Sequence, residues 1–182
     1  MLFLLLIPVV VIMFFGLPWL LINLGIRAMP DPPKPKITYG EFPFCLEYEI
    51  DGQIVVVEDT LVCEYGGISA DEGRGKFRNW KSHLSSGKDK LVLLKVENPA
   101  ENWMGTPRSQ IIYYDPGAAR YYMGDMGEDV SYTHSFPNAS VYEEYEDGST
   151  KSGTINAKEL YDLFKIRLLD WKYTPPIENE FS

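Results

Sequence analysis

Apolar and polar side chains alternate along residues 42 to 50. The apolar positions are Phe42, Phe44, Leu46, Tyr48 and Ile50. Successive side chains of a strand point to opposite faces of a sheet, so this period of two predicts a strand with one buried face. Asp51-Gly52 follows directly, and this pair favours the two-residue type I′ turn of a β-hairpin. We therefore expect a return strand over Ile54–Val57, continued after a bend by Leu61–Tyr65.

Further strands are expected in the second half of the chain. Residues 91 to 96 form an apolar run of strand length. Asp115-Pro116-Gly117 and Asp147-Gly148 are turn signals, and each lies between two segments rich in strand-forming residues. The paired segments are Gln110–Tyr114 with Arg120–Met123, and Ser140–Tyr145 with Lys151–Ile155. The pattern predicts two more hairpins.

A period near 3.6 residues replaces the alternation in two places. Phe77, Trp80 and Leu84 recur at helical spacing, which predicts a short helix over residues 75 to 85 that Gly87 closes. Near the C-terminus Asn156 and Glu159 have the spacing of a capping box.

An apolar stripe follows that capping box and ends before Pro175-Pro176. Its members are Leu160, Leu163, Phe164, Leu168 and Trp171. This spacing predicts a helix over residues 156 to 172, with the stripe buried against a sheet. The side chains expected to face outward are Lys158, Asp162, Lys165 and Asp170. The predicted fold class is α+β: a mostly antiparallel sheet of hairpins with this C-terminal amphipathic helix and one short internal helix.

Residues 1 to 26 contain no charged side chain, and Asn23 is the one strongly polar residue among them. A helix of this length rises about 39 Å, against about 30 Å for the hydrocarbon core of a bilayer. The segment is too long for the apolar part of a signal peptide and has no basic residue before it. We therefore expect a single transmembrane helix over 1–26, with the lipid bilayer as its partner.

Four prolines in residues 29 to 35 mark the end of that helix and predict a semi-rigid spacer. The expected organisation is an anchor over 1–26, a proline-rich linker over 27–36 and a soluble α+β domain over 37–182. The cations after the span, Arg27, Lys34 and Lys36, place the domain in the cytoplasm by the positive-inside rule. The acidic, Tyr-rich domain on a proline tether instead favours a single-pass cell-membrane protein whose domain is extracytoplasmic, and we adopt this second interpretation.

The net charge and the sequence motifs argue against several classes of function. The chain has 17 Lys and Arg against 26 Asp and Glu, a net charge of −9, which argues against a nucleic-acid partner. Two His and two Cys, all well separated, do not match a zinc-site spacing. Neither a phosphate-binding loop nor a G-x-S-x-G nucleophile motif occurs. The sequence predicts no catalytic residues, no metal ligands and no cofactor.

The two cysteines and the tyrosines leave alternatives open. If Asp51-Gly52 turns the first hairpin, Cys45 faces Glu58 and Cys63 lies beyond the paired section, so the cysteines are either two free thiols or a disulfide that needs a bend. Four tyrosines flank the Asp115 turn: Tyr113, Tyr114, Tyr121 and Tyr122. They are candidate ligand-facing aromatics for a sugar or protein partner, or else amphipathic rings at sheet edges.

The segments EFPFCLEYEIDG and VEDTLVCEYGGISADEGRGKFRNWKSHL resemble small membrane-anchored proteins of Gram-positive bacteria that have no assigned activity. The resemblance covers residues 40 to 125 and implies a bacterial-envelope location. The sequence as a whole therefore favours a membrane-tethered, non-enzymatic module that binds a protein or surface ligand at the cell envelope. The alternatives are a membrane-anchored envelope hydrolase and a regulatory protein facing the cytoplasm.

Overall fold

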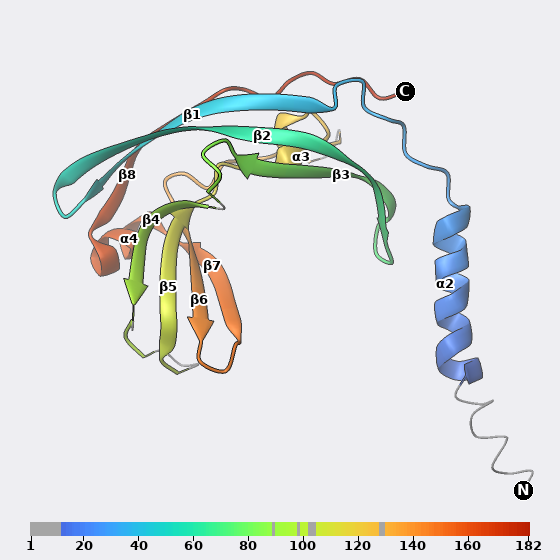
Figure 1. Ribbon diagram of the computed structural model, residues 1–182, viewed down its shortest axis with the longest axis horizontal. Coiled ribbons are helices and arrows are strands. Elements are labelled where there is room, and N and C mark those ends of the chain that lie inside the picture. Colours follow the sequence, from blue (N-terminus) through green and yellow to red (C-terminus); the bar gives the residue numbers. More distant parts are fainter. Residues whose placement is uncertain (1–11, 89, 98, 102–104, 128–129) are drawn as a thin grey trace, which may run out of the picture. The chain divides into compact units, whose positions relative to one another are not determined.

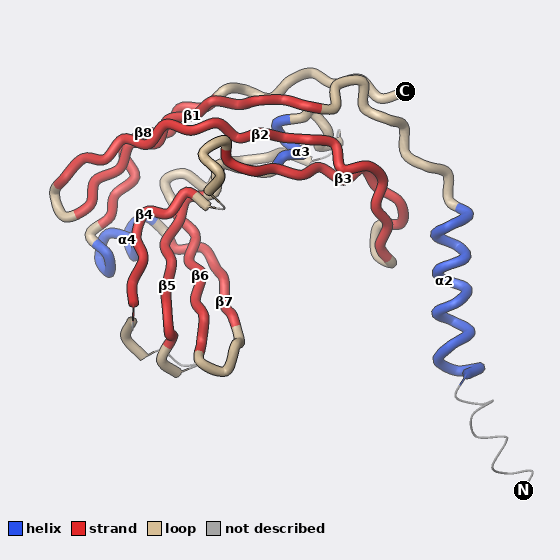
Figure 2. The backbone as a smooth tube through the Cα atoms, in the orientation of Figure 1, coloured by secondary structure: helices blue, strands red, loops and turns tan. Residues whose placement is uncertain are grey.

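The computed structural model describes residues 12–88, 90–97, 99–101, 105–127 and 130–182. Eight strands in these residues form two four-stranded sheets (Figure 1, Figure 2). The first sheet has the strand order β3-β2-β1-β8 and the second the order β4-β5-β6-β7. Strand β1 pairs antiparallel with both of its neighbours, and all three pairings of the second sheet are antiparallel.

The chain divides into two compact units. One unit joins the chain up to Lys36 with Tyr65–Trp80 and Glu180–Ser182. The other contains Ile37–Glu64 and Lys81–Asn179, and therefore the whole second sheet and most of the first. Strands β2 and β3 contribute residues to both units.

The first predicted hairpin is confirmed. Strands β1 (Tyr39–Ile50) and β2 (Gln53–Asp71) pair without interruption from Ile50↔Gln53 to Tyr39↔Glu64. Asp51 and Gly52 have φ values of 50° and 77°, as both central residues of a type I′ turn require. The alternation of β1 has the expected effect, since its even-numbered apolar residues from Phe42 to Tyr48 are buried.

The predicted helix over residues 75 to 85 is wrong, because these residues form strand β3 (Gly75–Leu84). The Asp71 carboxylate accepts hydrogen bonds from the backbone N–H groups of Gly73 and Arg74, at 3.0 and 2.8 Å, and so holds a tight turn after β2. The turn returns the chain alongside β2, and the Trp80 ring packs 5.4 Å from the ring of Tyr65. Pairing along the long hairpin overrides the helical spacing of the apolar residues.

The second sheet consists of β4 (Leu91–Glu97), β5 (Pro107–Tyr114), β6 (Ala139–Tyr145) and β7 (Thr150–Ile155). The expected apolar strand over residues 91 to 96 and the hairpin around Asp147-Gly148 are confirmed. The segment after Asp115-Pro116-Gly117 differs from the prediction. It forms the short helix α3 (Ala119–Tyr122), so Tyr121 and Tyr122 do not belong to a strand.

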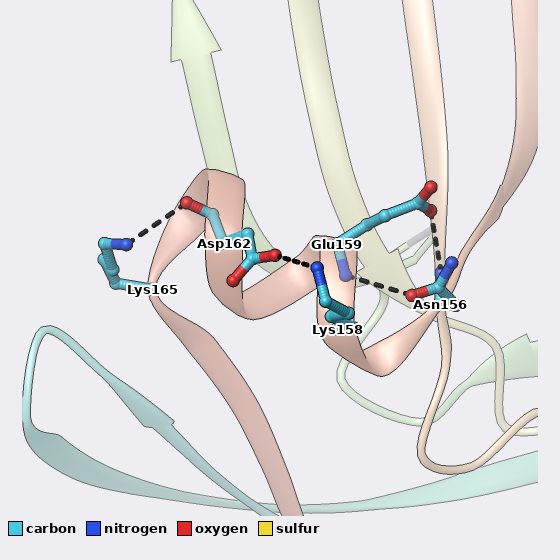
Figure 3. A network of polar contacts seen from close by, with 5 residues as sticks. All are labelled: Asn156, Lys158, Glu159, Asp162 and Lys165. Atoms are coloured by element: carbon cyan, nitrogen blue, oxygen red, sulfur yellow. Dashed lines mark hydrogen bonds and ion pairs between the residues drawn. The ribbon is translucent and has the colours of Figure 1, made fainter.

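The predicted C-terminal helix is half as long as expected. Helix α4 (Ala157–Phe164) has the predicted capping box, in which Asn156 and Glu159 each accept a hydrogen bond from the other's backbone N–H (Figure 3). The helix ends at Lys165, whose φ of 54° places it in the left-handed region.

The residues after Lys165 form β8 (Ile166–Tyr173), an edge strand of the first sheet paired with β1. Leu160 is fully buried on α4, whereas Leu163 is 68% exposed. Leu168 is buried on β8 instead. The prediction that five apolar side chains share one helix face is therefore wrong, and so is the α+β fold class. The described residues form two antiparallel sheets with few short helices.

The predicted transmembrane helix over 1–26 is contradicted. In the described residues a five-residue π-helix (η1, Ile12–Gly16) precedes α2 (Leu17–Ala28), which has Pro18 in its first turn. The twelve residues of α2 rise about 18 Å, against about 30 Å for a bilayer core. None of the helices in the described ranges reaches the length and apolarity needed to cross a membrane, and residues 1–11 lie outside those ranges. The single-pass cell-membrane localisation that rested on this helix is contradicted with it.

Candidate functional site

Three adjacent strands of the first sheet, β2, β1 and β8, place side chains in rows across its outer face. Cys45 on β1 lies opposite Glu58 on β2 and opposite Lys172 on β8. Directly opposed residues of a sheet point to the same face, and neighbours along a strand point to opposite faces. Phe44 is buried, so Cys45, Glu58 and Lys172 form one row on the face turned away from the core.

These strands line an open groove of about 550 Å³, called here the outer groove. Its lining residues are Pro43, Phe44, Cys45, Glu58, Asp59, Thr60, Lys172, Tyr173 and Thr174. Thr174 closes one end of the groove, since its backbone N–H and its hydroxyl both donate to the carbonyl oxygen of Pro43, at 3.0 and 2.9 Å. Phe44, Asp59 and Tyr173 lie opposite one another on the other face, so the groove offers the Lys172 ammonium, the Glu58 carboxylate and the Cys45 thiol on a fixed backbone.

Asp59 fixes the wall of the outer groove on the β2 side. Its carboxylate accepts hydrogen bonds from the hydroxyls of Ser85 and Ser86, at 2.8 and 2.6 Å, and from the backbone N–H of Thr60 at 2.7 Å. Burial raises the pKa of Asp59, but the hydrogen bonds from Ser86, Thr60 and Ser85 together outweigh it and bring the pKa below its ordinary value. Asp59 is therefore an ionised structural group that holds the turn after β3.

Lys172 supplies the positive charge of the outer groove. Its ammonium nitrogen lies 2.8 Å from the Asp170 carboxylate. This hydrogen bond is the main reason why the pKa of Lys172 is raised and that of Asp170 is lowered. Cys45 and Glu47 add smaller contributions that raise the pKa of Lys172, as expected if all three share the outer face. Both charges are thus present over the whole neutral range.

A group of rings, called here the aromatic cluster, packs against the inner face of the same strands. Its members are Phe44, Tyr114, Tyr121, Tyr122, Tyr132, His134, Trp171 and Tyr173. Trp171 joins the two sheets, with its ring centroid 5.1 Å from Phe44 on β1 and 4.7 Å from Tyr114 on β5. Tyr173 packs 4.2 Å from His134 and also lines the outer groove. The aromatic cluster therefore lies on the opposite face of β1 and β8 from the row of Cys45 and Lys172.

His134 is the one titratable base in the aromatic cluster. Within the part of the chain that the structure describes, neither of its buried ring nitrogens has a hydrogen-bond partner. Burial lowers the pKa of His134, although the charge of Asp115 opposes this effect. Burial also raises the pKa of Tyr122, and it raises the pKa of Tyr121 to about 12 with help from a hydrogen bond to Tyr173. The cluster is therefore uncharged at neutral pH.

The four tyrosines singled out in the sequence do not form a common surface. Tyr114 and Tyr122 are buried in the aromatic cluster. Tyr121 is half-buried and stacks on Tyr132 at 4.4 Å. Tyr113 lies on the opposite face of β5, where the Lys90 ammonium is 4.5 Å from its ring centroid. The tyrosine that lines the outer groove is Tyr173, which the sequence pattern assigned to no site.

Both cysteines are free thiols in the structure, and they lie in different environments. The predicted opposition of Cys45 and Glu58 is confirmed. Cys63 does not lie beyond the paired section, as expected, but opposite Gly40. It is fully buried, and burial raises its pKa to about 12, so it is inert as a thiolate. Cys45 is half-buried and lines the outer groove.

Comparison of the chain with protein-family models, with curated proteins and with solved structures finds no match. The resemblance to small membrane-anchored proteins of Gram-positive bacteria stays a prediction that these comparisons do not test. Across the described ranges of the chain, no three His, Cys, Asp or Glu side chains are grouped so that they could hold a metal ion. The function of the outer groove therefore has to be inferred from its own geometry.

Proposed function

We propose that the protein is a non-enzymatic binding module and that a protein ligand contacts the outer groove. The observation that carries this proposal is the row Glu58–Cys45–Lys172, in which charges of both signs flank a half-buried thiol in a groove of about 550 Å³. Such a row presents a donor and an acceptor at fixed spacing, which is how polar groups of an interface set the orientation of a partner.

The surface beside the groove favours a protein over a small molecule. Val56 and Ile54 lie on the same outer face of β2, opposite Glu47 and Glu49, and they are 55% and 64% exposed. Exposed apolar side chains next to a polar groove are typical of protein interaction sites. The groove is also open along the strands, whereas small-molecule sites enclose most of their ligand.

Cys45 provides a direct test, because Cys63 is buried and its pKa of about 12 keeps it unreactive. A cleavable photo-crosslinker attached to Cys45 in the full chain should capture a defined protein partner from cells that express the protein. The matched control carries Cys45→Ser and Ser152→Cys, which moves the crosslinker to the exposed strand β7.

We expect an adduct at Cys45 that is absent at position 152 and that is lost with Glu58→Lys or Lys172→Glu. The same adducts at both positions, or an adduct that survives both charge reversals, would contradict the proposed function. A melting temperature like that of the wild type shows that each variant is folded.

A further inference from the structure

The proline-rich segment 29–36, MPDPPKPK, is docked on strand β3 within its own compact unit. The Lys76 ammonium lies 2.7 Å from an oxygen of the Asp31 carboxylate. One N–H of the Arg78 guanidinium donates to the carbonyl oxygen of Pro33 at 3.2 Å. Pro35 is buried. The segment that the sequence suggested as a spacer is therefore a bound element.

The backbone of this segment has few N–H donors, because half of its residues are prolines, and those of Lys34 and Lys36 bind the residues near the C-terminus. Prolines lack an N–H, and a polyproline-type helix makes no hydrogen bonds of its own. The N–H groups of Lys34 and Lys36 donate to the carbonyl oxygens of Ser182 and Glu180, at 3.0 and 2.8 Å. The N–H of Ser182 donates in return to the carbonyl oxygen of Lys34 at 3.0 Å. The last residues of the chain thus form a short antiparallel ladder with the segment.

Arg78 and Phe181 form the centre of this contact. The guanidinium carbon of Arg78 lies 4.1 Å from the centroid of the Phe181 ring. Stacking on an aromatic face holds the planar guanidinium, so that it can present its N–H groups to a carbonyl in a fixed direction. Phe181 itself pairs with Pro35 through a β-bridge. The Phe181 ring therefore positions the donor, and the backbone of Glu180 and Ser182 on either side of it binds the proline-rich segment.

Gly75 provides a recess for the beginning of the segment. A Cβ atom at this position would lie 2.7 Å from the sulfur of Met29, and its φ of 69° is in the left-handed region. The backbone conformation therefore favours glycine, and a side chain here would also displace the Met29 thioether. Met29 has φ −61° and ψ 142°, which are polyproline values. The contact thus extends from Met29 at one end to Lys36 at the other.

We propose that Lys76, Arg78 and Phe181, with the backbone of Glu180–Ser182, are a binding site for proline-rich segments and that its partner in trans is residues 29–36 of a second copy of this chain. The site recognises an acidic side chain two positions before the carbonyl that Arg78 binds. All the contacts are non-covalent, so the segment of a second copy can make every one of them. The chain's own segment competes because its tether gives it a high effective concentration. Reciprocal exchange would produce a twofold dimer.

The test separates the site from the segment in the full-length chain. Asp31→Lys with Lys34→Pro disables the segment, because it removes the partner of Lys76 and one N–H donor while the backbone stays extended. A fluorescent peptide with the sequence MPDPPKPK and capped ends is then titrated and its anisotropy measured.

We expect the peptide to bind the disabled chain at least tenfold more tightly than the wild type, whose site is filled. Addition of Arg78→Ala should abolish that gain. Equal binding to the wild type and the disabled chain, or binding that survives Arg78→Ala, would overturn the proposal. If the disabled chain melts well below the wild type, Asp31→Asn alone replaces it in the same titration.

A second arm tests the assignment to a second copy. A tagged Arg78→Ala chain has an intact segment without a site, and the disabled chain has a site without a segment. The tagged chain should capture the disabled chain severalfold more than it captures an untagged Arg78→Ala chain. Self-association through any other surface affects both mixtures equally. Equal capture in the two mixtures would overturn the second-copy assignment even if the peptide binds.

Discussion

The two faces of β1 and β8 differ in kind, although their residues alternate along the same strands. On the inner face Phe44 is 5% exposed and packs 5.1 Å from Trp171. One residue further on, Cys45 lies on the outer face between Glu58 and Lys172. A slip of one residue in register would exchange the two faces. The uninterrupted pairing of β1 with β2 therefore fixes the core and the outer groove together.

The pKa shifts on the two faces point in opposite directions. On the inner face, burial lowers the pKa of His134 and raises that of Tyr122, so both neutral forms are favoured. On the outer face, Lys172 and Asp170 are joined by a hydrogen bond. It raises the pKa of Lys172 and lowers that of Asp170, so both charged forms are favoured. The charged side chains thus lie on the outer face, where water can reach them, and the buried rings of the inner face stabilise the fold.

The largest effect should come from the inner face at the point where it contacts Trp171. Phe44→Ala should reduce the free energy of unfolding by about 3 to 5 kcal/mol, because it removes a buried ring and leaves a cavity. Urea denaturation followed by tryptophan fluorescence measures this loss. Cys45→Ala on the adjacent outer position is the control and should lose only a small fraction of that amount. Equal losses at the two positions would show that the faces do not differ.

A comparable contrast exists on α4. Leu160→Ala should cost about 2 to 5 kcal/mol, because this side chain is fully buried. Leu163→Ala should change stability by no more than about 0.5 kcal/mol, because Leu163 is 68% exposed. Thermal melts of both variants check the boundary between helix and strand at Lys165. A large loss with Leu163→Ala would instead favour the long helix that the sequence suggested.

The neutral inner face should make stability depend on pH through His134. Its pKa is lowered in the folded state by burial, so the unfolded chain binds more protons as the pH falls below about 6.5, the ordinary value for His. Stability from this group is therefore present above that pH and is lost on acidification, at up to about 1.4 kcal/mol per pH unit for one proton.

The measurement is the difference in unfolding free energy between the wild type and His134→Phe, taken from pH 7 down to pH 5. Titration of the carboxylates cancels in this difference. As the pH falls, the wild type should lose more unfolding free energy than His134→Phe does. A gap independent of pH would mean that His134 does not become harder to protonate on folding.

The hairpins at Asp51-Gly52 and Asp147-Gly148 were predictable because their signals are local. Asp51-Gly52 sets both the turn and the register of β1 with β2, and the alternation of β1 identifies its buried face. The opposition of Cys45 and Glu58 follows from these two features alone. The half of the outer groove on β1 and β2 could therefore be derived from the sequence.

The part of the outer groove on β8 could not be derived from the sequence. The apolar residues from Leu160 to Trp171 also have the spacing of one continuous helix. Leu160, Phe164 and Leu168 have helical spacing, yet Leu168 is buried on a strand. The switch occurs at Lys165, which takes a left-handed conformation without the Gly or Asn that usually marks one. Pairing with β1, a contact between residues more than a hundred positions apart, decides the outcome. Lys172 consequently appeared to be the last residue of a helix, with Tyr173 directly after it.

The smallest effect should be an electrostatic one on the outer face, with no change in folding. Lys172→Glu should leave the melting temperature unchanged, because the ammonium group is on the surface and its ion pair with Asp170 is exposed. The substitution should nevertheless slow the reaction of Cys45 with an anionic disulfide reagent, because it reverses the charge beside the thiol.

The useful quantity is the ratio of that rate to the rate with neutral iodoacetamide, because ionisation of the thiol cancels in this ratio. We expect the ratio to fall severalfold in low salt and to recover as added salt screens the charge. A ratio that does not change would mean that Lys172 does not face Cys45 in solution, and the row of side chains on which the outer groove depends would then be wrong.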